Sequence, residues 1–272
     1  MDQEIYAQFD RLIAAVSALP EVRSVGKSGG SSLPQAGESD VDIFVFCETV
    51  PKAAERQGAV RALGDCVTGC RIGETPSRHW GTCDFVDLDG AEICLMYYPI
   101  SEMNAEIDAV LSGARLDKED NYFYPTGRLA SFLSLHILCD KQGYIASMKE
   151  RLSAYPAELA KKLMDRHLNE LEDTEDLERA VARKDALFYH FALDLSLDHF
   201  LQALFAMNQC YFPSRKRTIQ HVQAFSKKPE QCSARLQKIL ELGAKAETIP
   251  QSYDEFSSLC SELSALSRTI AL

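Results

Sequence analysis

Two carboxylates, Asp40 and Asp42, open a run at 40–46 that is rich in β-branched and aromatic residues. Such a run predicts a buried β-strand. Because side chains alternate between the faces of a strand, both carboxylates point to one side, roughly 7 Å apart at the backbone. Mg²⁺ relieves the repulsion between like charges at that spacing and takes carboxylate and phosphate oxygens as ligands. The pair predicts a magnesium site, and the plainer alternative is an edge strand that begins at a turn.

A third acid, Glu92, stands at the start of a second strand. Two β-prone runs, 83–88 and 91–98, are joined by Asp89-Gly90, which is a strong hairpin signal. Glu92 opens the second run in otherwise apolar company, where an isolated charge is costly without a partner. We therefore expect Glu92 to join Asp40 and Asp42 as the third catalytic carboxylate and metal ligand.

A glycine and serine turn, Gly29-Gly30-Ser31-Ser32, precedes the Asp40 strand by a few residues. Its backbone N–H groups and hydroxyls are open to a phosphate, because no bulky side chain blocks them. A phosphate cradle and a metal site would then lie one strand apart, so these four residues are the predicted binding site for a phosphorylated co-substrate.

The preceding Gly26-Lys27-Ser28 is similar to the end of a Walker loop, but that motif needs a glycine five residues earlier, where Glu21 stands. This segment is therefore dismissed as a phosphate-binding motif.

These residues must be positioned by an α+β fold. An amphipathic helix at the start of the chain ends near Pro20, a strand at 22–25 leads into the turn, and 52–66 is helical by composition. Beyond Pro99 the strand signal fades. Helical periodicity then predicts helices at 103–111, 129–139, 157–171, 186–207 and 236–242. We expect an N-terminal mixed sheet with helices at 1–118 and an all-α domain at 119–272.

Composition narrows the partners and the location. Forty acidic and twenty-nine basic side chains give a net charge of −11, which disfavours a long nucleic acid as substrate. The nine scattered cysteines form no CxxC pair, as is typical of reduced cytosolic thiols. With an acidic start and no long apolar stretch, the chain is expected to be cytoplasmic, without membrane contact, and a monomer or a homodimer.

Taken together, these features resemble the polymerase-β-like nucleotidyltransferase superfamily, whose signature is a Gly-Ser turn, an Asp-x-Asp strand and a third carboxylate on a later strand. The matching residues are Gly30, Ser31, Asp40, Asp42 and Glu92, with glutamate where aspartate is commoner. The resemblance implies a nucleotidyltransferase domain at 1–118 that uses two Mg²⁺ ions and an NTP, with ATP favoured, as co-substrate.

The second half carries a similar resemblance. The stretch 204–208, the triplet at 211–213 and Lys216 are similar to the helical domain of bacterial antibiotic nucleotidyltransferase-like proteins, which act on aminoglycosides or lincosamides. This resemblance implies that residues 119–272 bind a small hydroxylated acceptor and that Lys216 contacts the triphosphate. Asp140 is either a base in this half or simply a helix end.

Three functions remain open from the sequence. The first is transfer of a nucleoside monophosphate, AMP by preference, to a hydroxyl of a small molecule such as an antibiotic. The second is the same transfer to a macromolecule, either a tRNA end or a tyrosine or serine of a partner protein. The third is a nucleotide-binding module without turnover.

Overall fold

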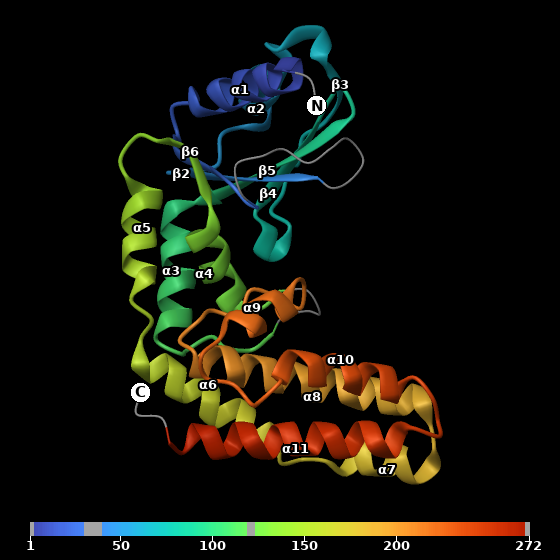
Figure 1. The fold of residues 1–272 in the computed structure, drawn as a ribbon. Helices are drawn as coiled ribbons and strands as arrows, with labels where there is room; N and C mark the ends of the chain where they lie inside the picture. Colours follow the sequence, from blue (N-terminus) through green and yellow to red (C-terminus); the bar gives the residue numbers. More distant parts are fainter. Residues whose placement is uncertain (1–2, 30–39, 119–122, 270–272) are drawn as a thin grey trace. The chain divides into compact units, whose positions relative to one another are not determined.

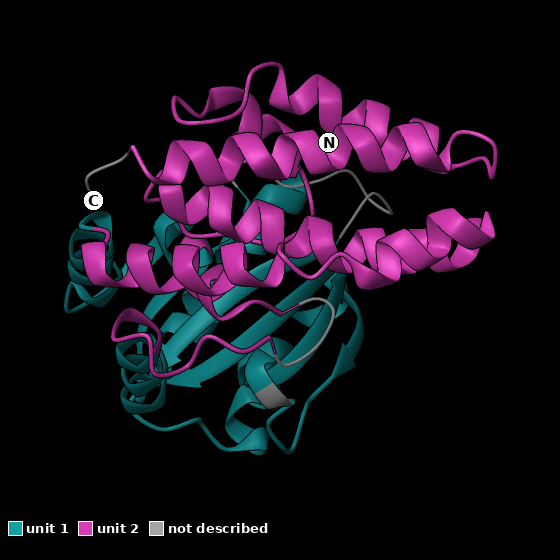
Figure 2. Cartoon of the chain, turned by 90° about the horizontal axis from the view of Figure 1, so that it is seen from below, with its two compact units in different colours: residues 1–109, 131–154 teal, residues 110–130, 155–272 magenta. Residues whose placement is uncertain are grey.

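The structure, a computed structural model, describes residues 3–29, 40–118 and 123–269. It divides into two compact units (Figure 2). Unit 1 comprises Met1–Ala109 with Ser131–Ala154, and unit 2 comprises Val110–Ala130 with Tyr155–Leu272. The chain thus passes between the units three times, where the sequence suggested a single boundary after residue 118. Unit 1 carries a mixed sheet and unit 2 is helical, so the α+β fold class is confirmed.

The sheet of unit 1 is mixed, with strand order β3-β4-β5-β2-β1-β6 (Figure 1). Neighbouring strands are antiparallel except β2 and β5, which run parallel at its centre. The strands are β1 (Val22–Lys27), β2 (Val41–Cys47), β3 (Val67–Arg71), β4 (Thr82–Leu88), β5 (Ala91–Pro99) and β6 (His136–Asp140).

The hairpin between β4 and β5 confirms its sequence signal. Asp89 and Gly90 both have positive φ, 49° and 89°, as a two-residue type I′ turn requires. This turn sets the register that pairs Asp87 with Glu92 and Phe85 with Cys94.

One face of the sheet forms the core of unit 1. Alternate side chains of β2, including Ile43 and Val45, pack with Leu12 and Val16 of α1 (Gln3–Ser17) and with Val60 of α2 (Ala53–Arg61). Figure 1 shows both helices on the same side of the sheet. Because side chains alternate along β2, and Val41 and Ile43 face this core, Asp42 lies on the opposite face.

A buried ion pair closes this core. Arg56 pairs with Asp84 of β4 and also donates to the carbonyls of Gly73 (2.6 Å) and Pro51 (2.9 Å). The guanidinium lies over the Tyr97 ring, 5.1 Å from its centroid. Burial raises the pKa of Asp84, and the Arg56 charge opposes that rise. Asp84 therefore has a structural role, as the counter-charge of Arg56 in the core.

The opposite face of the sheet is aromatic where it meets the later helices of unit 1. Phe46 stacks on Phe132 at 4.9 Å between ring centroids and meets Tyr144 edge-on at 5.2 Å. Gly26 of β1 allows this approach, since a Cβ there would lie 3.2 Å from side chains of both Ile145 and Leu135. These helices are α3 (Ile100–Leu111) up to Ala109, the last turn of α4 (Pro125–Ser134) from Ser131, and α5 (Tyr144–Ser153).

The helix predicted over 129–139 is wrong in its second half. α4 ends at Ser134, and residues 136–140 form β6 against β1, with Val25 level with Cys139. The strand signal therefore does not end at Pro99. A short apolar run fits either a helix or a strand, and here the unpaired edge of β1 decides. Asp140 ends β6 and caps α5, because its carboxylate accepts from the backbone N–H of Ala146 at 3.0 Å.

Unit 2 is built around α8, which contacts α6, α7, α10 and α11. The predicted helices at 157–171, 186–207 and 236–242 are confirmed, whereas α5, α11 and strand β3 had no sequence prediction. No helix in the described ranges combines the length and apolar character needed to cross a membrane. The helices of unit 2 are α6 (Ala157–Glu170), α7 (Glu175–Arg183), α8 (Ala186–Met207), α9 (Thr218–Ala224), α10 (Cys232–Gly243) and α11 (Ile249–Ser267).

Candidate functional site

The candidate site lies at the start of β2, on the sheet face opposite α1. The parallel register pairs Val41 with Ile93 and Asp42 with Cys94, which places Asp40 level with Glu92 on the neighbouring strand. Asp40 and Glu92 are exposed and Asp42 is half-buried. Strand alternation therefore brings the three predicted carboxylates to one face and one end of the central strand pair.

The pKa values of two thiols, Cys83 and Cys94, respond to the charges near the start of β2. A hydrogen bond from Cys94 lowers the pKa of Cys83, and the same bond, together with burial, raises the pKa of Cys94. The charge of Asp42 acts on both thiols and that of Asp40 on Cys94, each raising the thiol pKa. Both aspartates thus act on the thiol pair between β4 and β5, and a cation there would meet a region of negative potential.

The donor set of this region suits a hard cation. Mg²⁺ commonly binds one or two carboxylates and completes its shell with water and phosphate oxygens, which Asp40 and Asp42 could support. Within the described part of the chain, no three His, Cys, Asp or Glu side chains gather as a group that could hold a metal ion. The role of Glu92 as third ligand stays a prediction.

The predicted phosphate turn is only partly described. Ser28 N–H donates to the carbonyl of Asp42 at 2.9 Å, so the turn begins beside the second aspartate. Gly29 has φ +75°, a left-handed conformation that favours glycine. Gly30, Ser31 and Ser32 lie outside the described residues.

Lys27, dismissed from the sequence with its Walker-like neighbours, is 2% exposed just before this turn. Its Nζ donates to the carbonyl of Ser28 at 3.3 Å, and burial lowers its pKa. Lys27 lies two residues after Val25, so the two side chains share one face of β1. This spacing is the sequence signal that could have predicted the burial of Lys27. The Walker-like motif therefore gave no indication that Lys27 is a buried base in contact with the start of the turn.

A short loop before β4 borders the same region. A 3₁₀ turn, Arg78–Trp80, ends at Gly81, and the Cys83 thiol donates to the carbonyl of Trp80 at 3.3 Å. The indole of Trp80 is 40% exposed. The loop therefore carries an accessible aromatic ring close to the thiol pair that feels the aspartates.

Lys216 belongs to unit 2 and is exposed. The preceding residue, Arg215, holds this segment in place through ion pairs. Arg215 pairs with Asp194 at 2.8 Å and with Asp198 at 3.2 Å, and Tyr124 also donates to Asp198. The Asp194 charge is the main cause that raises the pKa of Arg215, against the lowering by burial. Arg215 is thus committed to structure, which leaves Lys216 and Arg217 as the exposed bases of this segment, and Lys216 is the one that the sequence selected.

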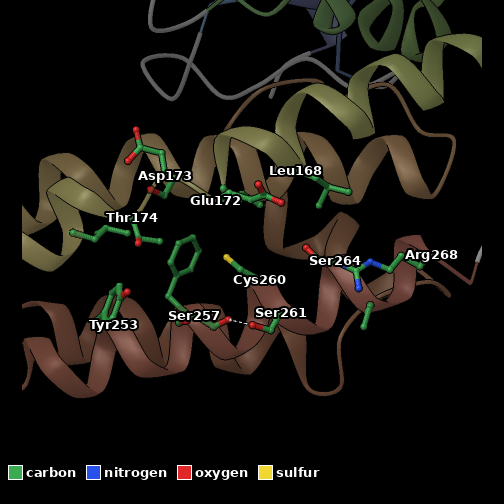
Figure 3. A pocket seen from close by; sticks show the side chains of 15 residues that line it. Leu168, Glu172, Asp173, Thr174, Tyr253, Ser257, Cys260, Ser261, Ser264 and Arg268 are labelled. Carbon is green, nitrogen blue, oxygen red and sulfur yellow. Dashed lines mark hydrogen bonds between the residues drawn. The ribbon is translucent and has the colours of Figure 1, made fainter.

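Unit 2 also contains a hollow of about 490 Å³ between the α6–α7 corner and α11 (Figure 3). Its apolar lining includes Leu171, Leu177 and Phe256. Thr174 and Tyr253 line it as well, and both donate to Glu178, so these hydroxyls already have partners. None of the predicted site residues lines this hollow.

Comparison with known proteins gives a family and a solved structure. The family model described as a domain of unknown function (DUF4037) matches residues 123–217. No curated protein matches the chain. Among solved structures, the chain is similar to a nucleotidyltransferase-like protein from Exiguobacterium sibiricum, at 12% identity and a TM-score of 0.47, over 98% of this chain and 73% of that one. The function therefore has to be argued from the side chains.

Proposed function

We propose that the chain is a magnesium-dependent nucleotidyltransferase that moves a nucleoside monophosphate, AMP by preference, from an NTP to a hydroxyl of a small molecule. The observation that carries the proposal is the β2–β5 register. In this register Asp42 lies level with Cys94. Extending it by one residue puts Asp40 level with Glu92, and strand alternation puts all three acids on one face. A structural role alone gives no reason for three acids at one end of one face, because like charges there destabilise the sheet.

The chemistry divides among these residues. The acceptor oxygen forms a bond to the α-phosphorus while the bond to the bridging oxygen breaks and pyrophosphate leaves. Asp40 and Asp42 hold the metal, and Glu92 takes the proton of the acceptor hydroxyl. Magnesium, when bound, neutralises charge on the phosphate oxygens. The rest of the catalysis is positioning of the acceptor and the NTP.

Phosphate binding falls to the turn and to one lysine. The N–H groups of Gly29 and Gly30 and the hydroxyls of Ser31 and Ser32 hold the terminal phosphates, as a backbone-lined turn suits anions. Lys216 supplies the positive charge toward the triphosphate, supported by its exposure and by the commitment of Arg215 to Asp194 and Asp198.

The acceptor is a small, hydroxylated and preferably cationic molecule, such as an aminoglycoside or a lincosamide. The net charge of −11 supports this choice, because an acidic protein attracts a cation and repels the phosphate backbone of a long nucleic acid. The protein is placed in the cytoplasm, where ATP and Mg²⁺ are available.

The test follows label from α-³²P-ATP into products with Mg²⁺ and with a panel of acceptors: an aminoglycoside, a lincosamide, tRNA and a mixture of proteins. Labelled small acceptor with release of pyrophosphate is the expected result, and EDTA should abolish it. Label that enters only tRNA or protein would move the proposal to a macromolecular acceptor.

One observation favours a second candidate, a nucleotide-binding module without turnover. The described residues contain no group of three metal-binding side chains, and two carboxylates suffice to bind a magnesium–nucleotide complex. Calorimetry that finds Mg²⁺-dependent ATP binding, with no pyrophosphate released for any acceptor, would select this module over the enzyme.

A further inference from the structure

Trp80 is the one tryptophan of the sequence, and its ring is left 40% exposed. Tryptophan is the largest side chain and usually buries its ring, or covers a ligand or a partner with it. An exposed indole on a loop that is held in place is therefore a candidate binding surface.

The loop is held by several contacts of its backbone. Trp80 N–H donates to the carbonyl of Ser77 at 2.9 Å, and Ser77 N–H donates to the carbonyl of Gly81 at 2.7 Å. Gly81 has φ +69°, and a Cβ there would lie 2.5 Å from the carbonyl oxygen of Tyr97. The loop can approach β5 this closely only with glycine at residue 81.

The indole itself has a defined surrounding. His79, which is buried, makes a T-shaped contact with it at 4.8 Å between ring centroids. The hydroxyl of Tyr98 donates to the carbonyl of His79 at 3.4 Å and so ties the loop to β5. The ring of Trp80 is thus oriented before any ligand arrives, which reduces the entropy lost on binding.

The position of this loop links it to the carboxylates. The Cys83 thiol donates to the carbonyl of Trp80 at 3.3 Å, and the same thiol lies in the field of Asp42. Cys94, which is hydrogen-bonded to that thiol, lies level with Asp42 on β2, so two neighbouring thiols connect the Trp80 loop to the aspartate. A nucleotide whose phosphates sit at the aspartates can extend its base toward this loop.

We propose that Trp80 is the stacking platform for the nucleobase of the NTP and favours purines over pyrimidines. The inference rests on the proposed function, because it needs a nucleotide at the aspartates. The larger ring system of a purine covers more of the indole, and stacking of a base on an aromatic side chain needs no hydrogen-bond pattern. Base preference then comes from the area of overlap.

The test uses the intact chain and two independent signals. Because Trp80 is the single tryptophan, emission excited at 295 nm reports on this ring alone. The protein is titrated with ATP, GTP, CTP and UTP in the presence of Mg²⁺, by fluorescence and by calorimetry. Trp80→Leu, Trp80→Phe and, as a matched control, Phe191→Leu are titrated by calorimetry, and circular dichroism confirms that each variant is folded. Phe191 is an exposed aromatic residue of α8 in unit 2.

ATP and GTP are expected to quench the fluorescence of Trp80. The midpoint of this quenching should equal the midpoint of the calorimetric titration. Trp80→Leu should weaken Mg·ATP binding by roughly tenfold and CTP binding by much less, because stacking of a base is sensitive to removal of the ring. Trp80→Phe should keep most of the affinity and of the purine preference. Phe191→Leu should change neither.

Two results would overturn the platform while leaving the proposed function in place: calorimetric Mg·ATP binding with unchanged emission, or a Trp80→Leu variant that weakens ATP and CTP equally. Equal weakening is what a purely structural role predicts. No heat and no quenching with any NTP would instead remove the proposed function, and the platform with it.

Discussion

The start of β2 and the hollow beside α11 differ in what they offer a ligand. The first has Asp40 and Asp42 near Cys94, and after the hydrogen bond with Cys83 and burial their charges add to the rise in the pKa of that thiol. The second offers about 490 Å³, but the hydroxyls of Thr174 and Tyr253 already have a partner. Two carboxylates on one face of a strand end favour a cation, whereas volume alone indicates room. The candidate site of this protein is therefore assigned from its charges and not from the volume of the hollow.

The largest expected effect comes from removing one aspartate. Asp42→Ala should lower transfer of label from ATP by on the order of 10³-fold, since metal coordination contributes several kcal/mol to the transition state. The unfolding transition should stay close to that of the parent protein, because Asp42 is only half-buried. Steady-state pyrophosphate release and urea unfolding measure the two.

Asp65→Ala is the matched control, since Asp65 is an exposed carboxylate of unit 1. It should leave both transfer and stability unchanged. Normal turnover by Asp42→Ala would end the assignment of the site to β2.

The second effect separates two carboxylates of the same sheet. Asp84 faces the core and pairs with Arg56, so Asp84→Ala leaves a buried guanidinium without its counter-charge. We expect a loss of about 3–5 kcal/mol in the free energy of unfolding, as is usual when one partner of a buried pair is removed. Chemical denaturation measures it.

A double change, Arg56→Met with Asp84→Leu, should recover much of that loss, because it removes both charges. If the single and double variants were equally unstable, the pair would not be the cause. The two carboxylates then differ by the face of the sheet on which they lie. Asp84, on the core face, contributes to stability, and Asp42, on the opposite face, contributes to activity.

Local patterns predicted much of the fold, and contacts distant in sequence account for the misses. The helix at 186–207 and the Asp89-Gly90 hairpin were readable because a helical period and a turn residue pair are local signals. Strand β6 was not, since 136–140 becomes a strand only by pairing with β1. The same reason explains the interleaved units: β6 and α5 return to the sheet after the chain has left it.

The site divides in the same way. The spacing of Asp40 and Asp42 predicts their shared face, which stays a prediction because Asp40 directly precedes β2. That Cys94 lies level with Asp42 depends on the β2–β5 register, which no local pattern contains. The contact between Lys27 and the carbonyl of Ser28 depends on the backbone conformation after β1, which no local pattern contains either. The identity of the acceptor is not written in any local pattern, because acceptor pockets use ordinary polar and apolar side chains.

A third effect concerns the helical unit and pH. Burial, then the neighbouring His199 and Arg166 charges, lowers the pKa of His167 to about 3, while Asp198 opposes the shift. The folded state therefore keeps His167 neutral while the unfolded state, with a pKa near 6.5, takes up a proton. Stability from this group is complete above pH 6.5 and is lost as the pH falls toward 3.

At pH 5 the loss from His167 should be about 2 kcal/mol relative to pH 8. Urea unfolding at the two pH values measures it for the parent protein and for His167→Leu, in which the difference between the two pH values should shrink by that amount. An unchanged difference would mean that His167 is as accessible to protons in the folded protein as in the unfolded chain.

The smallest effect is expected in the hollow, and it tests the comparison from its other side. Ser264 lines the hollow, so Ser264→Leu places a larger apolar side chain at the wall of this open space. Transfer of label should be unchanged, and the free energy of unfolding should move by no more than about 0.5 kcal/mol, as for substitutions that neither break a contact nor crowd a core. Ser267→Leu, on the same helix but outside the lining, is its control. A selective loss of transfer in Ser264→Leu, with binding of Mg·ATP intact, would make the hollow the acceptor pocket, because filling it would then block the second substrate and not the first.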